Sequence, residues 1–333
     1  MKKIIIIIIL LIFSGYLYYN HAVSSPFNTK GSDSTFTINK GDGVKTIAKN
    51  LKDQKIISSE FFFEVHAWLS DLRSSFVAGD YNLNPQMSIT EIAKNLTGGG
   101  AISREKNLTF IEGWNNKDFA KYLETQGFGT ANAFSKLINT NKYNDQYKFL
   151  SDKSKTADLE GYLFPDTYRV YKNATQEDIL LKMLYNFDQK LSDQMRADIT
   201  KQGKSVFEIV TMASLLEKEV KTLDDMKIVS GIFWDRIKNG QALESCATLA
   251  YTLGENKPQY SASDTQIDSP YNTYKHRGLP PTPICNPGLK AITSAIYPTF
   301  TNYNYFLSDP ETGKTIFSAT YEEHLKNKAI YLK

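Results

Sequence analysis

The segment SVFEIVTMASLLEKEVKT, residues 205–222, carries the strongest structural signal in the chain. Ser205, followed three residues later by Glu208, forms a capping box, which predicts a helix that begins at this serine. With successive residues placed about 100° apart around the helix axis, Glu217 lies in the middle of an apolar face. The residues of that face are Val206, Val210, Ala213 and Val220, flanked by Ile209 and Leu216. The segment therefore predicts a core helix with one inward carboxylate.

Glu217 and its neighbour Glu219 have different predicted environments. Glu219 falls about 200° from Glu217 on the helix, and we expect it to be an ordinary solvated residue. A carboxylate buried without a paired cation has a raised pKa, because desolvation disfavours its charged form. A carboxylic acid that stays protonated near neutral pH is what general-acid cleavage of a glycosidic bond requires. The alternative is a structural ion pair between Glu217 and a buried cation such as Arg236.

The rest of this larger domain, residues 107–333, is expected to mix helices, strands and long loops. Apolar periodicity predicts a strand at 108–111 and helices at 117–125, 131–138 and 179–199. Between them lies an aromatic loop, Glu160–Tyr168, punctuated by glycine and proline. Residues 261–288 are rich in proline and glycine and are expected to form an extended loop. An ordered loop of that length inside a compact domain is usually functional.

A smaller module precedes this domain, at residues 35–102. Phe36–Ile38 alternates like a strand, and Val44, Ile47, Ala48 and Leu51 follow at the spacing of a helix face. An apolar helix is predicted at Phe61–Leu69, and a second strand followed by a helix is predicted at 81–96. The triple glycine at 98–100 marks the boundary. This pattern fits a small structural α/β domain or a sugar-binding module.

The N-terminal segment is the most apolar part of the chain. Lys2 and Lys3 precede an uncharged run of 16 residues, Ile4–Tyr19, which opens with six isoleucines. As a helix this run is about 24 Å long, slightly short of a bilayer core. The positive-inside rule keeps both lysines in the cytoplasm and places the domains outside. We expect a cytoplasmic tip at 1–3, an anchor at 4–20 and a linker at 21–34. The alternative is a signal peptide cleaved near Ala22-Val23-Ser24.

Composition excludes several functional classes. The chain has 333 residues and a formal net charge of only +3, whereas nucleic-acid binding needs a basic domain or stripe. Two cysteines are too few for a disulfide scaffold or a four-cysteine zinc site. The four histidines are scattered, and the chain lacks phosphate-binding, dinucleotide-binding and nucleophile-elbow motifs. We therefore expect no nucleic-acid partner, no metal and no cofactor, which leaves carboxylates and aromatic side chains as the available chemistry.

Six motifs occur in a characteristic order along the chain. They are TFIEGW (109–114), EGYLFPDTY (160–168), ASLLEKE (213–219), SPYNTY (269–274), GLPP (278–281) and NPG (286–288). With these motifs the chain resembles the YceG-like family over nearly its whole length. The resemblance implies an α+β protein with an N-terminal transmembrane helix, a small LysM-like module at 35–102 and a mixed α+β catalytic domain at 107–333.

The resemblance also implies an activity. Members of that family are endolytic transglycosylases of the inner membrane, which cut nascent peptidoglycan strands internally without using water. The first glutamate of their E-K-E motif is catalytic and corresponds to Glu217. The expected product carries a 1,6-anhydro-N-acetylmuramic acid end, and strand elongation stops there. The implied partners are peptidoglycan glycan strands and a complex with penicillin-binding peptidoglycan synthases, with the catalytic domain on the periplasmic side.

One loop is expected to position the substrate beside Glu217. Its candidate residues are Ser269, Tyr271, Asn272 and Tyr274, each with a polar group on the SPYNTY motif. Glu160 and Asp166 are weaker candidates, and Glu160 is equally suited to bracing a turn. Two other functions stay open. A hydrolytic muramidase would need a second carboxylate, such as Asp166 or Asp268. A non-catalytic peptidoglycan-binding scaffold would tolerate the loss of Glu217.

Both cysteines depart from the family pattern. Cys246 stands where members commonly have an aspartate, and Cys285 directly precedes the NPG motif. Outside the cytoplasmic membrane, neighbouring thiols tend to be oxidised. We therefore predict a disulfide between Cys246 and Cys285 that fixes the intervening loop over the catalytic cleft.

Overall fold

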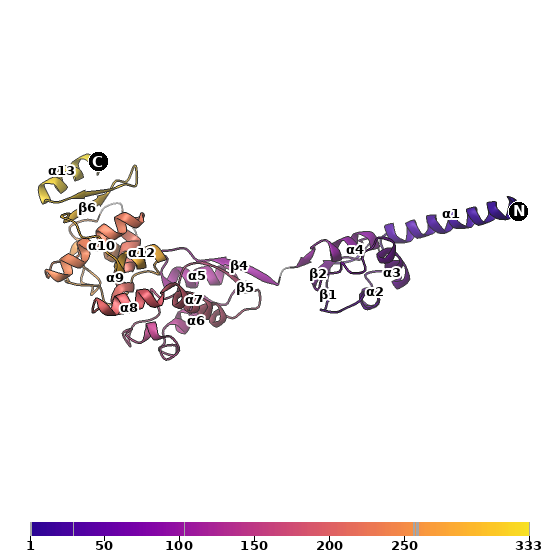
Figure 1. The fold of residues 1–333 in the computed structure, drawn as a ribbon, viewed down its shortest axis with the longest axis horizontal. Helices are drawn as coiled ribbons and strands as arrows, with labels where there is room; N and C mark the ends of the chain where they lie inside the picture. Colours follow the sequence, from indigo (N-terminus) through magenta and orange to yellow (C-terminus); the bar gives the residue numbers. More distant parts are fainter. Residues whose placement is uncertain (1, 29, 103, 256, 258–259, 333) are drawn as a thin grey trace. The chain divides into compact units, whose positions relative to one another are not determined.

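The computed structural model describes residues 2–28, 30–102, 104–255, 257 and 260–332. The chain divides into two compact units, Met1–Lys106 and Asn107–Lys333 (Figure 1). Both units mix helices with short antiparallel strands, so the expected α+β class is confirmed.

The first unit begins with a long apolar helix, α1 (Lys2–Ser24). Within the described residues, one helix is long and apolar enough to cross a membrane, and it is this one, over Lys3–Ser24. The helix continues four residues into the segment predicted as a linker, over residues 21–24. The reason is packing, because Val23 is buried in the core of the unit and its carbonyl accepts a hydrogen bond from the Thr90 hydroxyl.

The rest of the first unit has the order β1-α2-α3-β2-α4-β3. Strand β1 (Ser34–Ile38) pairs antiparallel with β2 (Gly79–Leu83), so that Phe36 lies opposite Tyr81, and β3 (Ala101–Ile102) adds to β2. Helices α2 (Val44–Asp53) and α3 (Glu60–Leu69) connect the first two strands, and α4 (Ile89–Thr97) follows. The predicted core positions of α2 and α4 are buried: Ile47, Ala48, Leu51, Ile89, Ile92, Ala93 and Leu96.

The second unit is largely helical. Its strands form two small sheets, β4 (Glu105–Thr109) with β5 (Thr167–Tyr171), and β6 (Tyr305–Ser308) with β7 (Thr315–Ser318). Its helices are α5 (Asn116–Thr125), α6 (Ala131–Ile138), α7 (Gln176–Lys190), α8 (Asp193–Lys201), α9 (Val206–Glu219), α10 (Leu223–Lys238), α11 (Cys246–Leu253), α12 (Leu289–Ile296) and α13 (Tyr321–Tyr331), with short 3₁₀ turns at Lys148–Leu150 and Asp264–Gln266.

Helix α9 is the central element of this unit. Its N-terminus has the predicted capping box, in which the Ser205 hydroxyl accepts from the Glu208 N–H and the Glu208 carboxylate accepts from the Ser205 N–H. The eight residues from Ile209 to Leu216 are all buried, because α10, α11 and α12 pack around the helix (Figure 1). The sequence predicted that only one face of this helix is buried, whereas the structure buries residues 209–216 on all sides of the helix.

Two other expectations differ from the structure. The helix predicted at 179–199 is two helices, α7 and α8, because the Ser192 hydroxyl accepts from the Met195 N–H and starts a new helix. Helix α11 was not predicted. It has no side-chain cap hydrogen bond at its N-terminus, and it ends at Gly254 in a left-handed conformation.

Gly161 allows the aromatic loop to contact α9. Its φ is +89°, and a Cβ at this position would lie 2.6 Å from Val210 Cγ1 and 2.7 Å from Pro283 Cβ. A left-handed alanine costs about 1–2 kcal/mol, and overpacking adds about 1–3 kcal/mol. Chemical denaturation should therefore show Gly161→Ala losing roughly 2–5 kcal/mol of unfolding free energy.

Gly127→Ala is the matched control for this prediction. Gly127 has a φ of +85° but no atom within 4 Å of the added Cβ, so only the backbone cost of about 1–2 kcal/mol applies. Equal losses for the two variants would contradict close packing of the loop on α9.

Candidate active site

Glu217 lies near the C-terminal end of α9, with its carboxylate at the N-terminus of α12. The Gly288 N–H donates to Glu217 Oε2 at 3.0 Å. Burial raises the pKa of Glu217 and the nearby charge of Glu112 raises it further, whereas the Gly288 hydrogen bond and the charges of Lys218 and Lys290 lower it. Burial is the largest of these effects, and the pKa of Glu217 is raised overall. The sequence therefore located a half-buried carboxylate with a raised pKa.

Arg236, the alternative partner of Glu217, is directed elsewhere. Its guanidinium donates to the Leu243 carbonyl oxygen at 2.6 Å and to the Asn304 carbonyl oxygen at 2.8 Å. The ion-pair alternative is therefore wrong for this cation.

Glu219 is not the solvated residue that the helical wheel predicted. Its carboxylate accepts hydrogen bonds from the Ser245 hydroxyl and, at 3.5 Å, from the Ala247 N–H. Both donors belong to the N-terminus of α11, where Glu219 takes the place of a side-chain cap. Burial raises the pKa of Glu219 despite these bonds. The wheel failed because α11, an element distant in sequence, covers the outer side of α9.

Glu160 is a third carboxylate at a helix N-terminus. It accepts from the Asn116 N–H in the first turn of α5, at 3.0 and 3.1 Å to its two oxygens. The Asn286 side chain also donates to Glu160 Oε1 at 3.1 Å. Burial and the charge of Asp158 hold the pKa of Glu160 well above its usual value. These contacts bear out the bracing role considered for Glu160.

Asn286 joins the segments that surround Glu217. Its side-chain oxygen accepts from the N–H groups of Gly161 at 2.9 Å and Leu163 at 3.1 Å. Its backbone N–H donates to the Trp114 carbonyl oxygen, and its own carbonyl oxygen accepts from the Gly113 N–H, both at 2.9 Å. Three of the six motifs therefore meet at one fully buried amide.

A cavity of about 710 Å³ opens beside Glu217 and Glu219. Its lining combines carboxylates, cations and tyrosines with few apolar side chains. The lining residues are Asn115, Lys117, Asp118, Glu160, Glu217, Lys218, Glu219, Cys246, Ala247, Ala250, Tyr251, Gly254, Glu255, Lys257, Tyr260 and Ile284. A polar, aromatic cleft of this size suits a hydroxyl-rich ligand better than an apolar one.

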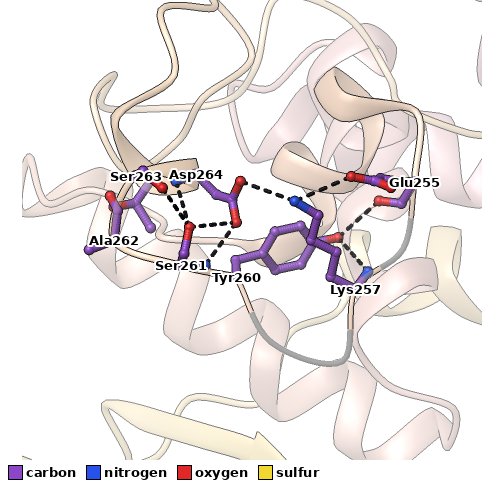
Figure 2. Close-up of polar contacts among 8 residues, drawn as sticks. Glu255, Lys257, Tyr260, Ser261, Ala262, Ser263 and Asp264 are labelled. Carbon is purple, nitrogen blue, oxygen red and sulfur yellow. Dashed lines mark hydrogen bonds and ion pairs between the residues drawn. The ribbon is translucent and has the colours of Figure 1, made fainter.

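The loop after α11 forms one wall of the cavity and is cross-linked by polar contacts (Figure 2). The Lys257 ammonium lies 3.2 Å from both a Glu255 and an Asp264 carboxylate oxygen. The Tyr260 hydroxyl donates to the Glu255 carbonyl oxygen at 3.2 Å and accepts from the Lys257 N–H at 3.3 Å. The Ser261 N–H and hydroxyl both donate to Asp264, each at 2.8 Å. This network holds Tyr260 at the cavity.

The four residues predicted from the SPYNTY motif lie behind this lining. Asn272 is fully buried, and its amide donates to the carbonyl oxygens of Thr265 at 3.0 Å and Ile267 at 2.8 Å. The Ser269 hydroxyl accepts from the Tyr271 N–H at 3.2 Å. These two side chains stabilise the loop internally.

The two tyrosines of the motif contact residues that line the cavity. The Tyr271 ring packs against Tyr251, with centroids 4.9 Å apart. The Tyr274 hydroxyl lies 3.2 Å from Cys246 Sγ, and burial raises the pKa of this tyrosine. No residue of the SPYNTY motif is among the described residues that line the cavity. Three residues that do line it, Tyr251, Lys257 and Tyr260, were not predicted from the sequence. The run CATLAYTL before Gly254 was the signal that could have revealed Tyr251 on a helix.

The carboxylates proposed for a hydrolytic mechanism lie outside the cavity lining. Asp166 accepts from the Asn186 amide at 3.0 Å, and Asp268 is almost fully exposed, 3.4 Å from the Lys275 ammonium. Within the described part of the chain, no group of three or more His, Cys, Asp or Glu residues is arranged to hold a metal ion.

The predicted disulfide is not formed. Cys246 is exposed and contacts Tyr274, whereas Cys285 is buried and its thiol donates to the Ser214 carbonyl oxygen at 3.3 Å. Each thiol thus has its own partner on a different element. The prediction was wrong because Cys285 faces α9 and Cys246 faces the motif loop.

Comparisons with known proteins identify the family of this chain. The model of the YceG-like family matches residues 36–330. A protein of Bacillus subtilis named endolytic murein transglycosylase is 32% identical, over 97% of this chain and 91% of its own length. A Streptococcus pneumoniae protein of the same name is 30% identical over 98% of this chain, which spans 64% of that longer relative.

A solved structure is also similar. The crystal structure of a YceG-like protein from Listeria monocytogenes matches with a TM-score of 0.61 and 32% identity, covering 90% of this chain and all of the other. The chain therefore belongs to the YceG-like family, and the resemblance found in its motifs is confirmed.

The two cysteines should differ in their reaction with a thiol reagent. We expect the native protein to be alkylated once, at exposed Cys246, and Cys285 to react only after denaturation. The reaction of Cys246 in the native protein should be slow, because partial burial raises the pKa of its thiol. Peptide mass spectrometry before and after unfolding measures this order. Failure of both thiols to react in denatured, unreduced protein would instead indicate a disulfide.

Proposed function

We propose that this protein is an endolytic murein transglycosylase in which Glu217 acts first as general acid and then as general base. Membership of the YceG-like family makes it an enzyme of the lytic transglycosylase class, which acts on peptidoglycan. The observation that carries the residue assignment is a half-buried Glu217 with a raised pKa, held by a helix N-terminus beside a polar cavity.

The proposed reaction needs one carboxyl group and no water. Protonated Glu217 donates its proton to the leaving oxygen of the N-acetylmuramic acid–N-acetylglucosamine bond, and that bond breaks. The C6 hydroxyl of the muramic acid then attacks its own C1, and its proton passes to the Glu217 carboxylate. The products are two shorter strands, one of which ends in 1,6-anhydro-muramic acid, and Glu217 regains its proton.

The surroundings of Glu217 suit both steps of this cycle. Burial favours the protonated acid that begins the reaction. The Gly288 N–H at the start of α12 stabilises the carboxylate that forms when the proton leaves. The substrate's own N-acetyl group can stabilise the positive charge that develops at C1, so a second carboxylate is not required.

The motif loop positions the cavity wall in this proposal. Tyr271 and Tyr274 support Tyr251 and Cys246, which line the cavity. Asn272 and Ser269 hold the loop that carries both tyrosines. We assign all four residues to substrate positioning through these contacts.

The first unit supports a membrane-bound enzyme with a glycan-binding module. Helix α1 is proposed as a single-pass anchor in the cytoplasmic membrane, with the catalytic unit on its outer side. The β1-α2-α3-β2 order is proposed as a LysM-like module that retains the glycan strand. An anchored strand terminator would act beside the synthase that elongates the strand, so we retain a penicillin-binding synthase as its proposed partner.

Glu217→Gln should abolish anhydro-product formation while leaving the fold intact, because glutamine keeps the shape and cannot donate the proton. The measurement is mass spectrometry of purified glycan strands after incubation with each protein. Asp268→Asn removes an exposed carboxylate and should keep full activity. An active Glu217→Gln enzyme would refute the assignment. Reducing ends in place of anhydro ends would indicate a hydrolase, with Glu219 as the neighbouring second carboxylate.

The pH dependence should follow the charges around Glu217. The acid must be protonated, so kcat/KM should fall as the pH rises through the pKa of Glu217. Glu112 raises that pKa and Lys290 lowers it. Glu112→Gln should therefore move the alkaline limb of the profile to lower pH, and Lys290→Gln should move it to higher pH. Shifts of the same sign, or unchanged limbs, would show that another group controls the rate.

A further inference from the structure

Helix α3 exposes three large apolar side chains on the side away from its core, which is unusual for a helix at the surface of a small domain. Phe63 and Ala67 are buried in the core of the first unit. The opposite side, which we call the outer face of α3, consists of Phe61, Val65, Trp68 and Leu69 at helical spacing. Phe61, Trp68 and Leu69 are 66%, 60% and 57% exposed. A cluster of large apolar side chains exposed on one side of a helix usually marks a surface that contacts another molecule or a membrane.

The flank of α3, between its core side and its outer face, is fixed to the end of α1. The rings of Phe62 and Tyr18 are in edge contact, with centroids 5.7 Å apart. The Tyr19 hydroxyl lies 3.1 Å from His66 Nδ1, within hydrogen-bond distance. Figure 1 shows α3 beside the C-terminal end of α1. The outer face is therefore held close to the point where α1 reaches the module.

The length of α1 determines how deep in the bilayer its contact with α3 would lie. A helix crosses the hydrocarbon core with about 20 residues. Counted from Ile4, the first residue after the two lysines, such a span ends near Val23, which is already buried in the module. The α1 residues that contact α3, Tyr18 and Tyr19, therefore fall inside this span rather than beyond it.

We propose that the outer face of α3 inserts into the outer interfacial layer of the membrane that α1 crosses, as a second, aromatic attachment of the module. Tryptophan and tyrosine are enriched at this layer, where an apolar ring meets polar headgroups. The proposal rests on α1 being a membrane anchor, as proposed above. Two attachments would fix the orientation of the module on the bilayer, which one helix alone leaves free to rotate.

The rim of this face is compatible with an interface. Glu60, at the start of α3, lies 3.1 Å from the Lys52 ammonium, so its charge is compensated. Glu64 and Ser70 border the face, where headgroups and water would solvate them. A covering protein or a second copy of the chain would also hide these side chains, and the experiment separates those occupants from lipid.

The test uses the full chain inserted in phospholipid vesicles that contain brominated acyl chains, which quench tryptophan on contact. The emission of Trp68 is the difference between the wild type and Trp68→Phe. We expect that difference to be lost in bromolipid vesicles, and more strongly with bromines close to the headgroups than near the terminal methyl. Trp68 should also be shielded from acrylamide, a quencher in the water.

Two further variants make the result specific. In a Trp68→Phe chain, Phe61→Trp places a reporter on the same face and should be quenched by bromolipid. Thr35→Trp in the same background is the matched control, because Thr35 is exposed on β1, which Figure 1 draws at the end of this unit away from α1. This control should stay unquenched by lipid and accessible to acrylamide.

The outcomes distinguish the two proposals. A chain that fails to float with the vesicles would refute the anchor and with it this inference. A chain that inserts while Trp68 remains open to acrylamide would overturn the inference alone. Shielding from acrylamide without bromolipid quenching would mean that protein covers the face, and would also overturn it.

Discussion

The buried amide of Asn286 is the contact on which the catalytic unit depends. It binds the carboxylate of Glu160, the backbone of the aromatic loop that follows this glutamate and the Trp114 carbonyl oxygen, all more than 100 residues away in sequence. An unpaired buried amide is costly, so each partner must be present for the others to be stable. Two residues further along, Gly288 donates to Glu217. The same segment therefore closes the core and orients the candidate acid.

Helix N-termini recur around the cavity as partners for carboxylates. Glu160 meets α5, Glu217 meets α12 and Glu219 meets α11. In each case burial raises the pKa while the helix N–H groups oppose that rise. Burial thus favours the protonated form of each carboxyl group, while the helix N–H groups stabilise the anion that forms when the proton leaves. The proposed acid–base cycle of Glu217 requires such a balance.

The two units differ in how completely they bury their apolar helices. The catalytic unit buries a helix on all sides and leaves carboxylates at its end. The first unit surrounds a small sheet with helices, one of which, α3, stays apolar on the side that faces neither the core nor α1. Together with α1, that side points to a function at a membrane surface. The candidate active site and the proposed membrane attachment lie in separate units of the chain.

Local sequence determined much of this protein. Patterns within one helix or turn predicted the apolar helix α1, the capping box at Ser205 and the core positions of α2 and α4, of which Val44 alone is only half-buried. Contacts between distant segments decided the rest. Glu219 is half-buried against the N-terminus of α11, Asn272 braces its own loop, and Cys246 and Cys285 face different elements. A helical wheel contains one helix only, whereas these environments are created by the neighbours that the tertiary fold brings to it.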